Sequence, residues 1–149
     1  MQVKDIMTTN TVCANPDDPI QKIAALLYTN GYHGIPVVRQ GTKTLVGIIT
    51  ESDFFTREGL SFYLTPYIDK MKNKSAAMPD KERSELSNLV DATARDIMKI
   101  EPVTISPTAD IEELAKVFSD KKIHTVPVVD KDELVGIVTM ADMVKLINK

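Results

Sequence analysis

Residues 33–38 read His-Gly-Ile-Pro-Val-Val, and residues 124–129 read His-Thr-Val-Pro-Val-Val. After a polar turn each run leads into a second one: Leu-Val-Gly-Ile-Ile-Thr at 45–50 and Leu-Val-Gly-Ile-Val-Thr at 134–139. Two β-branched runs joined by a polar turn predict an antiparallel hairpin. Their continuous apolar character predicts strands that are covered on both faces. The chain therefore contains the same buried hairpin twice.

The repetition extends outward from the two hairpins. Lys4-Asp5-Ile6-Met7 matches Arg95-Asp96-Ile97-Met98 at an offset of 91 positions (Met7 to Met98), and the offset falls to 89 beyond the hairpin turn (Gly47 to Gly136). A surface turn tolerates such a length change. Apolar residues spaced i, i+3, i+4 and i+7 predict a helix with one buried face before each hairpin. These residues are Ile20, Ile23, Ala24 and Leu27 in the first copy, and Ile111, Leu114, Ala115 and Phe118 in the second.

The ends of each copy complete a β-α-β-β-α unit. We expect a short leading strand near Val12 and near Val103, and a closing helix from about Ser52 and from about Ala141. Residues suited to the start of the helices precede the apolar stripes: Asp17 or Asp18 as a cap with Pro19 in the first turn, and Asp110 in the second copy. The predicted fold class is α/β (α+β), with a first unit at 1–57 and a second at 94–149.

Residues 58–93 match nothing else in the chain. Pro66 and Pro79 divide this insert, and Asp80 can cap a helix that carries Leu86, Leu89 and Val90 on one side. We expect an ordered helical connector with a flexible tip near residues 72–78. An interaction surface is the alternative.

Composition excludes several classes of protein. The net charge is −3, which disfavours nucleic acid binding, and 43% of the 149 residues are hydrophobic, enough to bury a core. Cys13 is the only cysteine, so no intramolecular disulfide can form, and with two histidines the soft ligands are too few for a structural zinc site. We expect a soluble cytoplasmic protein that contacts no membrane, because no leader pattern and no apolar run of about 20 residues is present.

The order Asp-Ile-Met, His-x-x-Pro-Val-Val and Gly-Ile-(Ile/Val)-Thr-x-x-Asp, present twice, resembles the CBS domain, and the pair resembles a Bateman module. The resemblance covers all but the connector. It implies two units related by a pseudo-twofold axis and packed through their sheets. It also implies two clefts that bind adenosine-containing ligands such as AMP, ADP, ATP or S-adenosylmethionine. No cofactor is required, and a homodimer of stacked modules that regulates a separate effector protein is expected.

A Thr-x-x-Asp pattern stands where each closing helix begins. An ionised carboxylate can accept hydrogen bonds from both hydroxyls of a ribose, and a threonine one turn earlier can donate to a phosphate or ribose oxygen. Thr50 with Asp53, and Thr139 with Asp142, have this spacing. The alternative is structural: the threonine caps the helix and the aspartate complements its dipole.

The resemblance distributes the remaining candidate residues between two clefts. The first cleft comprises Thr11, Val12, Tyr32, Gly34, Ile35, Ile137, Thr139 and Asp142. The second cleft comprises Pro102, Val103, Ile123, Thr125, Val126, Ile48, Thr50 and Asp53. His33 and His124 occupy the position of a phosphate-contacting histidine in some relatives, although a structural role is the alternative for a lone histidine.

The position after each histidine narrows the expected ligand. Relatives that hold polyphosphates often carry an arginine there, whereas this chain has Gly34 and Thr125. We therefore expect AMP or S-adenosylmethionine rather than ATP. No catalytic triad, metal cluster or glycine-rich phosphate loop is present in the sequence, so we expect a regulatory protein and not an enzyme. The rival hypothesis is a dimerisation or protein-interaction module with vestigial clefts.

Overall fold

The computed structural model describes residues 1–55 and 92–148. The first copy contributes α1 (Ile20–Asn30), β1 (Gly34–Val38) and β2 (Leu45–Thr50). The second contributes α5 (Ile111–Lys121), β4 (Thr125–Asp130), β5 (Glu133–Thr139) and α6 (Met140–Lys145). Between them lie the short α4 (Ala94–Ile97) and β3 (Lys99–Ile100), and 3₁₀ turns occur at Val3–Asp5, Glu51–Phe54 and Leu146–Asn148. The predicted connector helix around Leu86 falls outside the described residues.

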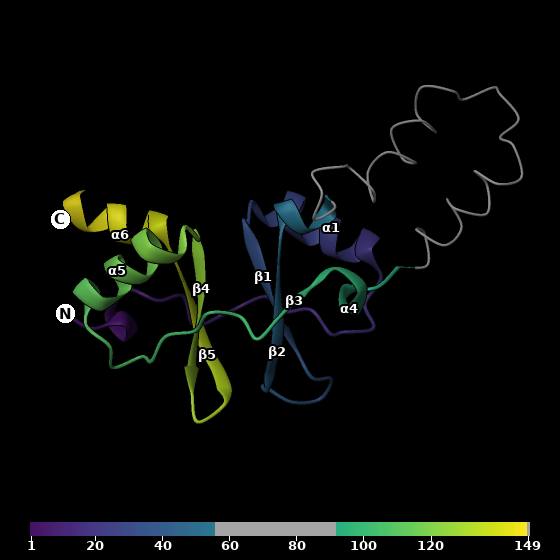
Figure 1. Cartoon of the computed structure of the whole chain (residues 1–149), viewed down its shortest axis with the longest axis horizontal. Coiled ribbons are helices and arrows are strands. Elements are labelled where there is room, and N and C mark those ends of the chain that lie inside the picture. Colours follow the sequence, from purple (N-terminus) through teal and green to yellow (C-terminus); the bar gives the residue numbers. More distant parts are fainter. Residues whose placement is uncertain (56–91, 149) are drawn as a thin grey trace, which may run out of the picture.

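The elements form layers, with the two hairpins at the centre and helices on the outside (Figure 1). Helices α5 and α6 lie on the outer side of β4 and β5, while α1 and α4 lie on the outer side of β1 and β2. The predicted α/β fold with two repeated units is confirmed. No helix in the described part of the chain is long and apolar enough to cross a membrane.

Both predicted hairpins are present and antiparallel. In the first, Gly34 pairs with Thr50, and in the second, Thr125 pairs with Thr139. Every residue of β1 is buried, as its continuous apolar character predicted. The prediction was wrong for β5, whose residues alternate between buried and partly exposed. The equivalent residues of the two copies occupy equivalent places, and each candidate threonine stands at the end of a hairpin.

The helices before the hairpins bury a narrower face than predicted. Ile20, Ile23 and Leu27 are buried in α1, and Leu114 and Phe118 are buried in α5. Ala24 and Ala115 are exposed, so their assignment to the buried face was wrong. They lie at the margin of the apolar stripe, where a methyl side chain is too short to reach the sheet.

The start of α1 also differs from the prediction. The helix begins at Ile20, and Pro19 is the N-cap residue, with no side-chain cap hydrogen bond. Asp18 accepts a hydrogen bond from Asn15 N at 2.8 Å and pairs with Lys22 Nζ at 3.2 Å. It therefore closes the preceding turn instead of capping the helix.

The leading strand of each copy is reduced to a single parallel backbone bridge. Ala14 bridges to Val37, and Ile105 bridges to Val128. Both bridges lie two residues beyond the predicted positions near Val12 and Val103.

The two Asp-Ile-Met segments are exchanged between the copies. Val3 is 0% exposed and packs in the core of the second copy, with Leu114 and Phe118, whereas Ala94 and Ile97 pack in the core of the first. Figure 1 shows the N-terminal segment beside α5, and α4 beside α1. Each segment thus completes the hydrophobic core of the other copy.

Matching backbone hydrogen bonds hold the exchanged segments. Val3 N donates to Ala109 O at 2.9 Å, and the equivalent Ala94 N donates to Asp18 O at 2.8 Å. Later in each segment, Thr8 exchanges two hydrogen bonds of 2.9 Å with Ile137, and Lys99 pairs with Ile48 as β3 extends the first sheet. The exchange is therefore symmetric, and it couples the folding of the two units.

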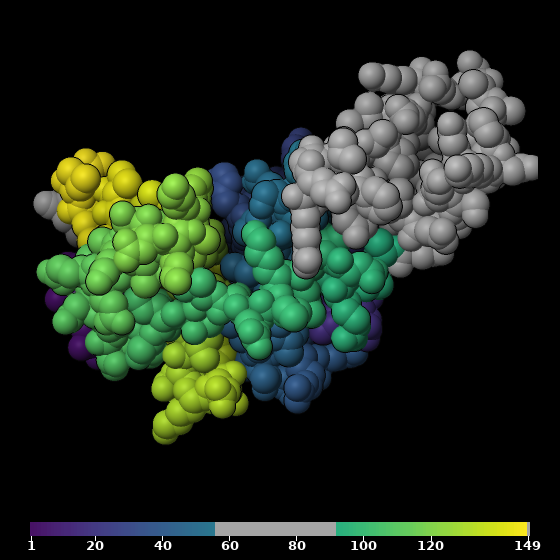
Figure 2. All heavy atoms as spheres, in the orientation of Figure 1, coloured from purple at the N-terminus to yellow at the C-terminus, as the bar shows by residue number. Residues whose placement is uncertain are grey.

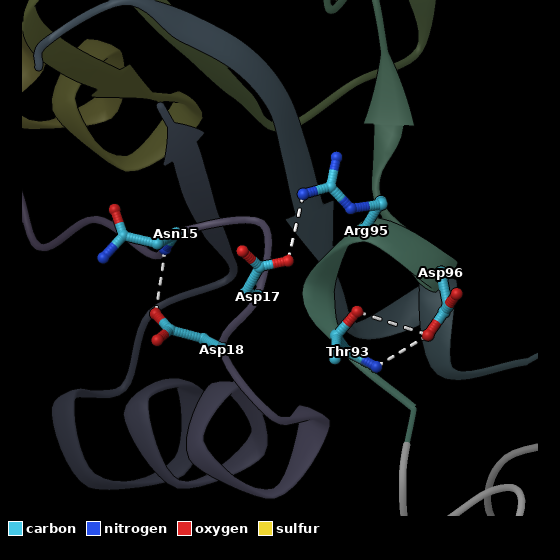
Figure 3. A network of polar contacts seen from close by, with 6 residues as sticks. All are labelled: Asn15, Asp17, Asp18, Thr93, Arg95 and Asp96. Atoms are coloured by element: carbon cyan, nitrogen blue, oxygen red, sulfur yellow. Dashed lines mark hydrogen bonds and ion pairs between the residues drawn. The ribbon is translucent and has the colours of Figure 1, made fainter. Parts of the chain in front are cut away.

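Side chains reinforce the exchange at the start of α4 (Figure 3). Arg95 Nη2 lies 3.0 Å from Asp17 Oδ1, on the loop before α1. Thr93 N and Thr93 Oγ1 both donate to Asp96 Oδ2, at 2.8 and 3.3 Å. The same Thr-x-x-Asp arrangement occurs at the ends of β2 and β5.

Candidate functional site

A cavity of about 540 Å³ lies between the two units. The face seen in Figure 2 is hollowed between them. The wall of the cavity is built from β2, the turn after it, the segment from β3 onward and the turn before β4. Its residues are His33, Ile48, Thr50, Glu51, Ser52, Lys99, Ile100, Glu101, Pro102, Val103, Lys122, Ile123, His124 and Thr125.

Most residues predicted for the second cleft meet in this wall. Ile48 and Thr50 come from the first copy, and the residues from the second copy are Pro102, Val103, Ile123 and Thr125. His33 and His124 also line it. Val126 is fully buried, and neither it nor Asp53 lines the cavity. Residues far apart in the sequence thus form one wall that combines apolar and polar side chains.

Asp53 is held close to the cavity by three interactions. Its Oδ2 accepts hydrogen bonds from Thr50 N at 2.7 Å and from Thr50 Oγ1 at 3.3 Å. Its Oδ1 lies 3.3 Å from Lys99 Nζ, and the Asp53 side chain is only 8% exposed. Thr50 Oγ1 is also 2.8 Å from Ser52 Oγ. The carboxylate is therefore fixed, and Oδ1 keeps a lone pair for a further donor beside the exposed Lys99 ammonium.

The second Thr-x-x-Asp pair has nearly the same geometry. Asp142 Oδ2 accepts from Thr139 N at 2.8 Å and from Thr139 Oγ1 at 3.0 Å, and Asp142 Oδ1 lies 3.3 Å from Lys145 Nζ. Thr93 and Asp96 repeat it at a helix start that the 540 Å³ cavity does not reach. In all three pairs the aspartate caps the backbone N–H of the threonine. The Thr-x-x-Asp spacing alone therefore does not indicate ligand binding, and only a pair that lies beside a cavity is a candidate for it.

The residues predicted for the first cleft are placed differently. Gly34 and Ile35 are buried in β1, while Tyr32 is exposed. Ile137 exchanges two backbone hydrogen bonds with Thr8. Thr11 lines a second cavity of about 510 Å³, near the hairpin turns, together with Cys13, Thr42 and Lys43. The described cavities therefore bring together the second cleft and not the first.

The cavity carries charges of both signs. His33 Nδ1 lies 3.2 Å from Glu51 Oε1, in a pair that is exposed on both sides. Lys99 and Lys122 contribute ammonium groups, and Glu101 contributes a further carboxylate. Such a wall suits a ligand with an apolar ring and a polar end. Among the described residues, no group of three histidine, cysteine or acidic side chains gathers that could hold a metal ion.

Sequence reasoning missed the contribution of residues 99–101. They reach the cavity because the second Asp-Ile-Met segment docks on the first copy. The signal was the glycine inside each second strand, because glycine in a strand interior often marks the close approach of another backbone. A Cβ on Gly47 would lie 2.9 Å from Lys99 O, and one on Gly136 would lie 2.9 Å from Thr8 O.

Comparison with known proteins identifies the repeated unit. The family model described as "CBS domain" matches residues 3–58 and 94–149. The protein MJ1426 of Methanocaldococcus jannaschii is 32% identical over 97% of this chain and 90% of its own length. Among solved structures, the CBS domain pair of protein MJ0100 in complex with 5′-methylthioadenosine and S-adenosyl-L-methionine is 25% identical, with a TM-score of 0.69 over 99% of both chains.

A third neighbour supports the fold alone. CBSX2 in complex with AMP is 23% identical, with a TM-score of 0.72 over 99% of this chain and 96% of its own. The two family matches coincide with the two repeated units, and the solved neighbours are CBS pairs. The chain belongs to the CBS-domain family and contains two CBS units in tandem.

Proposed function

We propose that this chain is a regulatory module that binds an adenosine-containing ligand in the second cleft. The observation that carries the proposal is the 540 Å³ cavity, whose wall combines residues of both units. Its volume lies within the range of roughly 300–1,000 Å³ that is typical of small-molecule sites. The AMP, 5′-methylthioadenosine and S-adenosyl-L-methionine bound by CBS pairs of similar fold support this choice of ligand class.

Each part of the wall suits one part of such a ligand. The aliphatic side chains of Ile48, Val103 and Ile123 offer a flat apolar slot for adenine. Asp53 Oδ1 can accept from a ribose hydroxyl in competition with Lys99. His33 and His124 line the same cavity and can donate to the polar part of the ligand. With no arginine at positions 34 and 125, the site favours AMP or S-adenosylmethionine over ATP.

Binding between the units provides a means of regulation. A ligand that contacts both copies stabilises one relative placement of the two, and so shifts the population toward that conformation. An effector protein that recognises this conformation would be coupled to the ligand. The chain thus senses a small molecule and does not transform it.

A thermal-shift panel with AMP, ADP, ATP and S-adenosylmethionine tests the proposal. A ligand at about 100 times its dissociation constant stabilises the folded state by roughly 2.7 kcal/mol. We expect a clear rise in melting temperature with AMP or S-adenosylmethionine and a smaller one with ATP. Unchanged melting temperatures with all four compounds would rule the proposal out.

A specific observation also favours self-association. Tyr28 on α1 and Val144 and Ile147 near the C-terminus are large, exposed apolar side chains. We propose that a second copy of the chain covers them in a homodimer. Light scattering after size exclusion should show a dimer for the wild type and a monomer for V144D/I147D. A monomeric wild type would contradict this assignment.

A further inference from the structure

Glu101, in the wall of the 540 Å³ cavity, has a strained backbone conformation. Its φ is 52°, in the left-handed region. Contact between Cβ and the backbone disfavours this region by a factor of about five to thirty in population. The next residue is Pro102, and a residue before proline prefers an extended backbone. Both the side chain of Glu101 and its neighbour therefore oppose the conformation that the cavity wall adopts.

The other left-handed residues with side chains in the described ranges, 1–55 and 92–148, lie where this conformation is common. Lys122 is the C-cap residue of α5, and Lys131 and Asp132 form the turn between β4 and β5. Helix C-caps and two-residue hairpin turns regularly contain left-handed residues. Glu101 belongs to neither class. Its strain therefore calls for a specific explanation.

The chain crosses from the first unit to the second at Glu101. Before this residue, Ile100 in β3 pairs with Gly47 of the first hairpin, and after it Ile105 bridges to Val128 of the second. Figure 1 shows the chain after β3 running across to the second unit. A change of backbone conformation at Glu101 would therefore move the cavity wall, and with it the two units, relative to one another.

The first copy makes the equivalent crossing without a left-handed residue. Asn10, which corresponds to Glu101, has a negative φ, and Thr11 N donates to Thr9 O at 3.0 Å across it. This is a three-residue turn closed by a hydrogen bond. The second copy cannot form that bond, because Pro102 stands in the place of Thr11 and has no N–H. Pro102 thus prevents the closed turn, and Glu101 turns the chain in the left-handed conformation.

The two crossings also differ in the cavities that they line. Glu101 and Pro102 line the cavity between the units, whereas Asn10 lines neither of the two cavities described above. The left-handed turn therefore occurs beside the open second cleft. The hydrogen-bonded turn occurs beside the first cleft, whose predicted residues these cavities do not bring together.

We infer that the turn at Glu101 and Pro102 is the conformational switch of the second cleft. In the left-handed form it holds the cleft open, and in the hydrogen-bonded form seen at Asn10 it closes the cleft. A ligand that binds only the open cleft favours the left-handed turn, and its apparent affinity falls with the fraction of molecules in which the turn is closed. This inference rests on the proposed function and names the element that couples the ligand to the placement of the two units.

Calorimetric titration of 5′-methylthioadenosine into the wild type, P102T, E101G/P102T and E101Q/P102T tests the inference. This ligand has no phosphate, so the charge of residue 101 has little direct effect on it. Threonine at position 102 supplies the N–H that closes the turn, and P102T should bind about fivefold more weakly than the wild type. Glycine removes the penalty on the left-handed form, so E101G/P102T should bind within about twofold of the wild type. E101Q/P102T, which keeps a Cβ, should bind as weakly as P102T.

Rescue by glycine separates the switch from a lost contact. Pro102 lines the cavity, so P102T also removes a side chain from its wall. A glycine at position 101 cannot replace that side chain. Equal affinities of E101G/P102T and P102T would therefore overturn the inference, and so would equal affinities of P102T and the wild type. If the wild type binds neither 5′-methylthioadenosine nor AMP, the proposed function fails, and the inference falls with it.

Melting temperatures without ligand test the strain itself. In an unstrained loop, glycine lowers stability because it gives the unfolded chain more freedom. At a left-handed position it also removes a penalty from the folded state. We expect E101G to melt at the same temperature as E101Q or higher. A lower melting temperature for E101G would show that residue 101 is not strained and would overturn the inference without involving a ligand.

Discussion

Lys99 Nζ lies 3.3 Å from Asp53 Oδ1, so the exchanged segment of the second copy neutralises the carboxylate that the first copy places beside the cavity. The lysine is 58% exposed and the aspartate 8%. The mobile partner of this pair is therefore the ammonium. A ribose hydroxyl at Asp53 Oδ1 would compete with Lys99 for that oxygen.

This competition predicts the effect of K99A on a ligand without a phosphate. Removing the ammonium frees Asp53 Oδ1 for the ribose, and partly exposed ion pairs contribute up to about 1 kcal/mol. We expect K99A to bind 5′-methylthioadenosine about twofold to fivefold more tightly in a calorimetric titration. K145A, which breaks the equivalent pair with Asp142, is the matched control and should leave the affinity unchanged. Weaker binding by K99A would mean that Lys99 contacts the ligand.

The three Thr-x-x-Asp caps allow binding and stability to be separated. D53A, D142A and D96A each remove the same backbone cap, so each should lower the free energy of unfolding by about 1 kcal/mol. Of the three aspartates, only Asp53 lies at the second cleft. D53A should therefore weaken AMP binding by at least about tenfold, because the charge-assisted hydrogen bonds between the carboxylate and the ribose are lost. Urea unfolding and calorimetry measure the two effects. An affinity of D53A equal to that of D96A would assign Asp53 a purely structural role.

The glycines inside β2 and β5 should tolerate no side chain. A Cβ on Gly47 would lie 2.8 Å from Met98 Sδ and 2.9 Å from the backbone oxygen of Lys99, and Gly136 meets Met7 and Thr8 in the same way. We expect G47A and G136A each to lower the free energy of unfolding by about 1–3 kcal/mol. The comparison variant is G34A. A Cβ on Gly34 would lie 3.3 Å from side-chain atoms of Thr125, so G34A should lower the free energy of unfolding by less than G47A or G136A. Similar urea midpoints for all three variants would contradict the close docking of the exchanged segments.

Burial raises the pKa of the Cys13 thiol above its ordinary value of 9.0. The folded state therefore holds the thiol proton more tightly than the unfolded chain does. This stabilisation is complete below about pH 9.0 and is lost as the pH rises toward the folded-state pKa. As the pH rises above about 9.0, the wild type should lose more stability in urea than C13A does. Parallel losses in the two proteins would show that the thiol titrates normally.

Much of the fold could be predicted because its signals are local. Paired β-branched runs specified both hairpins, and the spacing of Ile20, Ile23 and Leu27 specified the helix that packs on the first. The predictions for Ala24 and Asp18 were wrong. Ala24 lies at the edge of the apolar face of α1 and is exposed, and Asp18 accepts a hydrogen bond from Asn15 N instead of from the backbone at the start of the helix. Such details depend on distances of a few ångströms that periodicity does not record.

The docking of each Asp-Ile-Met segment on the other copy could not be predicted from the sequence repeat. Because the two copies present nearly identical docking sites, the sequence does not say which copy each segment joins. That choice places Lys99 beside Asp53 and residues 99–101 in the cavity wall. The resemblance nevertheless named several residues that line the cavity, among them Ile48, Thr50, Val103 and Thr125.

A crystal structure of the protein grown with AMP tests directly whether the second cleft binds the nucleotide. We expect density for the nucleotide in the cavity between Ile48 and Val103, with its ribose hydroxyls at Asp53. Nucleotide bound instead at Asp142, or no nucleotide between the two units, would contradict binding in the second cleft.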